Sequence, residues 1–83
     1  MKKNVVVTMT VSVEVDESKF TDEYMRIFRE VFYDFDTIDD HIMHLAQLEA
    51  RGLLDDENQE GYGKLSSMGI KVRVEDRMEE IEG

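Results

Sequence analysis

Residues 4–15 decide the fold, and they read Asn-Val-Val-Val-Thr-Met-Thr-Val-Ser-Val-Glu-Val. Every odd-numbered position in this stretch is apolar, and the even-numbered positions from Thr8 to Glu14 are polar. Alternation with a period of two, in residues that are mostly β-branched, is typical of a strand that buries one face. The sequence therefore predicts a strand over residues 4–15, longer than the usual ~5–6 residues.

Two helices are predicted after this strand, over residues 21–34 and 38–51. Thr21 and Thr37 stand where N-caps are expected, and Gly52 suits the left-handed position that ends a helix. Apolar residues recur in steps of three and four and so share one face of the first helix: Phe20, Tyr24, Ile27, Phe28, Val31, Phe32 and Phe35. The five aromatic residues among them are expected to be core. The short connection between the helices predicts an antiparallel αα-hairpin.

The C-terminal third is predicted to hold a long loop and a second strand. Residues 54–69 contain three glycines and a polar majority, which is typical of a loop. Residues 70–75 alternate again and predict a strand, and residues 76–83 form an acidic tail or a frayed extension of that strand. Residues 1–83 then make one α+β domain in the order β-α-α-β, with an αα-hairpin packed on one face of a small antiparallel sheet.

The first strand leaves an edge that natural proteins seldom keep open. We therefore expect strand 4–15 to pair with a second copy in a homodimer, or to add to a partner's sheet.

Composition excludes several classes of function. The 83 residues include no Cys, so there is no disulfide, thiolate metal site or cysteine nucleophile. No apolar run approaches the ~20 residues of a membrane span. The net charge of −10 argues against direct binding of nucleic acid or of an anionic membrane. The lack of cysteine is compatible with a reducing cytoplasm.

The negative charge is concentrated in residues 30–60, which hold ten acids against one base, Arg51, for a net charge of −9. Eight of these acids lie around the two ends of the second predicted helix or in the loop that follows: Asp34, Asp36, Asp39 and Asp40 around its start, Asp55, Asp56 and Glu57 just past its end, and Glu60 in the loop. A helix of this length spans ~20 Å, and duplex DNA also presents its charge as an extended array. The pattern predicts that these acids face a basic protein groove built for nucleic acid. The alternative is a solvated surface that serves solubility.

Chemistry other than binding has weak support. His41 and His44 are three residues apart beside Asp39 and Asp40, a spacing that could begin a metal site, but two half-exposed polar residues are the favoured interpretation. Gly61-Tyr62-Gly63 lacks the third glycine of a dinucleotide fingerprint. We expect this turn to present Tyr62 as a contact residue, the alternative being a tyrosine folded over the core. No catalytic, metal-binding or cofactor-binding residue is assigned, and the chain is not expected to be an enzyme.

Two stretches, residues 28–38 (Phe-Arg-Glu-Val-Phe-Tyr-Asp-Phe-Asp-Thr-Ile) and 41–52 (His-Ile-Met-His-Leu-Ala-Gln-Leu-Glu-Ala-Arg-Gly), resemble a group of small acidic proteins of bacteriophages and prophages. Glu60-Gly61-Tyr62-Gly63 and Met68-Gly69-Ile70 resemble later stretches of that group.

The resemblance implies a non-enzymatic inhibitor in the bacterial host cytoplasm, of the class that includes anti-CRISPR proteins and anti-restriction DNA mimics. Its partner would be a basic host protein or nucleoprotein complex, such as a CRISPR effector. The alternative function is a homodimeric structural or adaptor module that acts through its sheet edge. A metal-dependent enzyme using His41 and His44 is the third possibility.

Overall fold

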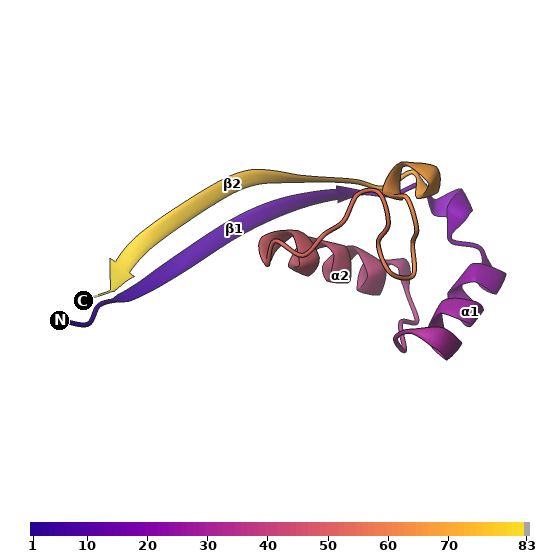
Figure 1. The fold of residues 1–83 in the computed structure, drawn as a ribbon, viewed down its shortest axis with the longest axis horizontal. Helices are drawn as coiled ribbons and strands as arrows, with labels where there is room; N and C mark the ends of the chain where they lie inside the picture. Colours follow the sequence, from indigo (N-terminus) through magenta and orange to yellow (C-terminus); the bar gives the residue numbers. More distant parts are fainter. Residues whose placement is uncertain (83) are drawn as a thin grey trace.

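The structure is a computed structural model that describes residues 1–82 (Figure 1). The elements follow one another as β1 (Asn4–Glu14), η1 (Glu17–Lys19), α1 (Asp22–Val31), α2 (Ile38–Ala50), η2 (Leu65–Met68) and β2 (Lys71–Glu82), where η marks a 3₁₀ turn. This is an α+β fold in the order β-α-α-β, as the sequence predicts, with α2 packed on a two-stranded antiparallel sheet.

β1 and β2 form a long antiparallel ribbon, paired from Asn4 opposite Glu82 to Glu14 opposite Lys71. The register shifts where Thr10 opposes Asp76 and Val11 opposes Val74. The residue left over is Glu75, so β2 carries a β-bulge there.

β2 continues past residue 75, where the sequence pattern predicts that the second strand ends. Residues 71–75 of the expected strand 70–75 form the inner part of β2, and residues 76–82 of the expected acidic tail form its outer part. Residue 83 of that tail lies outside the described residues. The inner alternation of β2 breaks at Glu75, because one extra residue reverses which positions share a face. Asp and Glu are also depleted in strands, so the sequence pattern stops where the bulge stands although the strand continues.

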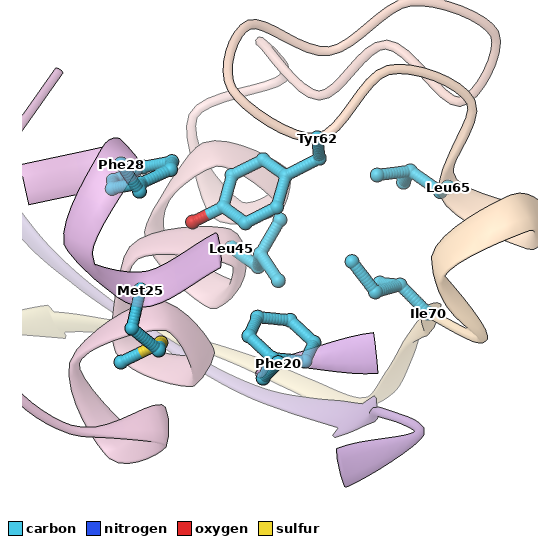
Figure 2. Close-up of a cluster of buried hydrophobic side chains, with 7 residues drawn as sticks. All are labelled: Phe20, Met25, Phe28, Leu45, Tyr62, Leu65 and Ile70. Carbon is cyan, nitrogen blue, oxygen red and sulfur yellow. The ribbon is translucent and has the colours of Figure 1, made fainter. Parts of the chain in front are cut away.

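The core lies at the inner end of the ribbon, where the helices and the long connection meet (Figure 2). Seven apolar side chains are buried there: Phe20, Met25, Phe28, Leu45, Tyr62, Leu65 and Ile70. α2 lies under the inner half of the ribbon and contacts both strands, whereas α1 stands beyond the ribbon's inner end (Figure 1). The outer half of the ribbon extends away from the core without cover.

Helix ends follow the sequence signals with one exception. The Thr21 and Thr37 hydroxyls accept hydrogen bonds from Tyr24 and Asp40 N–H groups, as predicted for N-caps. At the end of α2 the N–H of Leu53 donates to the carbonyl of Leu48 at 2.8 Å, and Gly52 has φ of 69°. This is the Schellman ending that the sequence indicates.

The exception is α1, which ends at Val31 and not at residue 34. The connection to α2 therefore runs over residues 32–37 and is longer than predicted. Phe32 leaves the helix with φ of −116° and ψ of −80° and is exposed, so the prediction that it belongs to the core is wrong. Phe20 and Phe28 are buried as predicted, while Tyr24 and Phe35 are half-buried.

The turn that carries Tyr62 offers a matched pair of glycine substitutions. Both Gly61 and Gly63 have positive φ, but a Cβ at Gly61 would collide with the Phe28 ring, whereas a Cβ at Gly63 meets nothing within 4 Å. We expect Gly63→Ala to cost about 1 kcal/mol from backbone strain alone. Gly61→Ala should cost about 1–3 kcal/mol more, because a tightly packed ring must shift. Urea unfolding of the two variants measures the difference, and equal losses would mean that this turn does not pack on Phe28.

Candidate functional site

An acidic tip, defined as Asp34, Asp36 and Asp39, lies on the connection between the helices and on the first turn of α2. All three side chains are exposed, and none has a cationic partner among the ion pairs within residues 1–82. The backbone is held in place locally, because Phe35 N–H donates to the Tyr33 carbonyl at 2.8 Å. Arg29 adds a long contact, 3.5 Å from its Nη1 to the Phe35 carbonyl oxygen.

Asp40 was expected in the same patch, but its carboxylate caps α2. It accepts hydrogen bonds from the N–H groups of Asp36 at 3.0 Å and Thr37 at 3.1 Å. With the Thr37 hydroxyl it completes a capping box. The two backbone N–H groups, Thr37 first, hold the pKa of Asp40 below its usual value. This carboxylate fixes the geometry of the tip and is not free to leave its cap.

Apolar side chains sit beside the acidic tip. Tyr33 is 48% exposed and its ring stacks on Phe35, with centroids 5.4 Å apart and planes at 20°. Phe35 stacks in turn on buried Phe28 at 5.6 Å, which ties the tip to the core. Met43 is 57% exposed and borders a shallow groove with Phe35 and His44. An exposed aromatic ring flanked by carboxylates is a suitable anchor for a protein interface.

Tyr33 and Met43 are contact candidates that the sequence reasoning missed. Tyr33 follows the end of α1 directly, and its exposure depends on that end coming three residues earlier than predicted. Met43 was overlooked although it stands on the outer face of α2, one residue from the inward-facing Ile42. Helical phase alone could have found Met43.

The second predicted acidic group, after α2, does not extend the tip as a single surface. The Asp55 carboxylate accepts hydrogen bonds from the N–H groups of Glu57 and Asn58 at 3.0 and 3.2 Å and so closes a turn. Glu57 lies 4.0 Å from Lys64. Asp56 and Glu57 border a depression that also includes Lys71 of β2. These residues are exposed but belong to the β2 side of the molecule.

Glu60 differs from the other three acids of this group because it lies near the tip. Its carboxylate is close enough to His44 to oppose the effect of burial, which lowers the pKa of that imidazole. The His44 ring is 5.1 Å from Tyr33 and 5.3 Å from Phe35. The prediction of one continuous patch thus separates into the acidic tip with Glu60 nearby, and a second group on the β2 side.

Tyr62 is buried, which corrects its prediction as a contact residue. Its side chain is 5% exposed, and Figure 2 shows the ring pointing into the core between Phe28 and Leu45. The turn around it is closed by bonds between Gln59 and Gly63, and the Tyr24 hydroxyl donates to the Gly61 carbonyl at 2.7 Å. The alternative interpretation, a tyrosine folded over the core, is the one that the structure confirms.

His41 is fully buried, so the expectation of two half-exposed histidines is wrong for it. Its Nδ1 is hydrogen-bonded to the Tyr62 hydroxyl at 2.7 Å, and its buried Nε2 has no hydrogen-bond partner in the described part of the chain. The rings of Phe20, Phe28 and Phe35 enclose it edge-on. Among residues 1–82 no three His, Cys, Asp or Glu side chains gather closely enough to hold a metal ion.

Burial lowers the pKa of His41 to about 4, and this predicts a loss of stability in mild acid. In the unfolded chain the His41 imidazole binds a proton as the pH falls through about 6.5, whereas in the folded chain it stays neutral until about pH 4. The folded state therefore has its full stability above pH ~6.5. It should fall as the pH decreases toward 4, by up to about 3 kcal/mol. His44, whose pKa is also lowered by burial, contributes in the same direction.

The double variant His41→Phe/Tyr62→Phe is the control for this acid sensitivity. It removes the titrating ring without leaving a buried hydroxyl unpaired. Urea unfolding at pH 7, 6 and 5 should show most of the slope lost in the double variant. An unchanged slope would assign the acid sensitivity to other groups.

Comparison of the chain with protein-family models, with curated proteins and with solved structures finds no match. No helix within residues 1–82 is both long and apolar enough to cross a membrane.

Proposed function

We propose that this chain is a non-enzymatic inhibitor that binds the basic, nucleic-acid-binding surface of a host protein through its acidic tip. A phage-encoded anti-defence protein of the anti-CRISPR kind, acting in the bacterial cytoplasm, fits this description. The single observation that carries the proposal is the acidic tip itself, three exposed carboxylates without cationic partners beside the half-exposed Tyr33 ring.

Electrostatics support this role more than a passive one. The tip backbone is fixed by the capping box and by the stacking of Phe35 on Phe28, so the backbone positions that carry its carboxylates are set before a partner arrives. Preorganised charge reduces the entropy lost on binding. A protein surface that binds DNA phosphates presents Lys and Arg at close spacing, and the acidic tip is complementary to such a surface. The attraction acts over about 8 Å at physiological salt and weakens as salt is added.

Tyr33 adds an apolar contribution to binding, which salt does not screen. Its ring supplies apolar area with a polar hydroxyl at the end, a combination common at interface centres. A purely electrostatic ligand would bind any basic surface, whereas an aromatic anchor requires a matching pocket. We therefore expect selectivity among basic proteins.

The test is competition for a captured partner. Immobilised chain is incubated with nuclease-treated bacterial lysate, and proteins that elute with increasing salt are purified. Each is then bound to labelled duplex DNA and titrated with the chain. The proposal expects the chain to displace the DNA, with an affinity that falls as salt rises. A stable ternary complex of partner, DNA and chain would reject nucleic-acid mimicry.

A further inference from the structure

The chain has more surface than a compact protein of its size. Its radius of gyration is 15.4 Å and its extents are 52 × 22 × 20 Å, whereas a compact domain of 83 residues has a radius of roughly 12 Å. Its accessible surface is 6187 Å², which exceeds the value expected for 9.7 kDa, about 5,100 Å², by roughly 1,000 Å². A stable protein interface buries about 800 Å² on each partner. The excess is therefore large enough to contain one interface.

The excess surface comes from the outer half of the ribbon (Figure 1). Apolar side chains are exposed on both of its faces, with Val5, Val7 and Ile81 on one and Val6 and Met78 on the other, each between 43% and 64% exposed. A two-stranded ribbon without cover is marginal in water. The outer half of this one is thus a segment that another surface would stabilise.

The two edges of the ribbon differ in charge. β1 has no charged residue from Asn4 to Val13, and it runs without a bulge. β2 carries eight charged residues, a bulge at Glu75, and ion pairs along its length between Arg73 and Glu75 at 2.8 Å and between Arg77 and Glu79 at 3.0 Å. Charges and bulges are the devices that keep edge strands from pairing. Only the β1 edge lacks them.

From these observations we infer that two copies of the chain pair antiparallel through their β1 edges and form a continuous four-stranded sheet. A two-fold axis makes such an interface self-complementary, because the same strand is presented by both copies. Like charge does not oppose the pairing, since β1 meets β1 across an uncharged stretch. The net charge of −10 belongs mainly to residues 30–60, which lie on the helices and the connection after them.

This inference is independent of the proposed function, because it uses none of the residues of the acidic tip. The dimer would present two acidic tips, one from each copy. Substitutions at the tip should therefore leave the dimer intact, and substitutions in β1 should leave the tip folded.

The experiment is light scattering after size-exclusion chromatography on two matched variants. Val5→Lys/Val7→Lys places new charges in β1, which would be central in the four-stranded sheet. Met78→Lys/Ile81→Lys places the same number in β2, which would remain at its outside. We expect the wild-type chain and the β2 variant to run at twice 9.7 kDa, and the β1 variant at 9.7 kDa with an unchanged circular dichroism spectrum.

Other outcomes overturn the inference. If the wild-type chain is a monomer at micromolar concentration, the homodimer is rejected, and the β1 edge would instead pair with an extended segment of another protein. Dimers lost in both variants would indicate packing through the ribbon faces, and dimers retained in both would place the interface elsewhere. If the β1 variant fails to fold, single cysteines test the pairing, because the chain has no cysteine of its own. With the two-fold axis at the middle of the uncharged stretch from Asn4 to Val13, position 8 of one copy lies beside position 8 of the other. Thr8→Cys should then form an intermolecular disulfide on oxidation, while Glu80→Cys should not.

Discussion

Reversal of the acidic tip, Asp34→Lys/Asp36→Lys/Asp39→Lys, is expected to weaken binding to the captured partner by at least 100-fold, about 2.8 kcal/mol. This loss corresponds to slightly less than about 1 kcal/mol of binding free energy for each of the three substitutions. A larger loss is possible, because charge reversal removes an attraction and also brings like charges together, which costs several kcal/mol in a close interface. Equilibrium binding at fixed salt measures the effect.

The matched control is Glu23→Lys/Glu80→Lys/Glu82→Lys. Each triple variant adds three positive charges and removes three negative ones, so both change the net charge from −10 to −4. Each also replaces one acid in the first turn of a helix, Asp39 in α2 and Glu23 in α1, so the helix-dipole penalty is the same. We expect the control to bind within a few-fold of wild type. Equal losses in the two variants would mean that net charge alone drives binding and that the acidic tip has no special role.

Truncation of the core, Leu45→Ala, is expected to reduce the free energy of unfolding by about 2–5 kcal/mol. Leu45 is 0% exposed and lies in α2 at the centre of the buried cluster. A domain of this size has a total stability of only about 4–12 kcal/mol, so the variant should melt far below wild type or fail to fold. The loss follows from a cavity that the surrounding rings can only partly close.

Met43→Ala is the control for this truncation. Met43 stands two positions earlier on the same helix and is 57% exposed. It should change stability by no more than about 0.5 kcal/mol. Urea unfolding of both variants checks the contrast, and a comparable loss from Met43→Ala would mean that α2 buries a different face.

The parts of the fold that depend on local sequence signals could be predicted. The alternation of residues 4–15 predicted β1 to within one residue, and Thr21, Thr37 and Gly52 marked three of the four ends of the α-helices. The remaining end, at Val31, carries no stop signal, since apolar residues continue in helical phase through Phe32 and Phe35. The extent of β2 was missed because its bulge reverses the alternation and its outer residues are charged.

The candidate site was predictable in charge but not in geometry. Concentration of acids in residues 30–60 is a fact of composition, whereas the use of Asp40 and Asp55 as caps depends on the turns that they close. Tyr62 points inward because of contacts that are distant in sequence, with His41 and with Phe28. No local pattern encodes such contacts, so a tyrosine between two glycines gave no sign of its direction.

Amide hydrogen exchange of the chain, measured with and without the captured partner, locates the surface that the partner covers. If the acidic tip is the binding surface, the partner slows exchange over residues 33–40 and leaves residues 71–82 unchanged. Slower exchange confined to the ribbon or to residues 55–58, with the tip unaffected, would contradict the proposal.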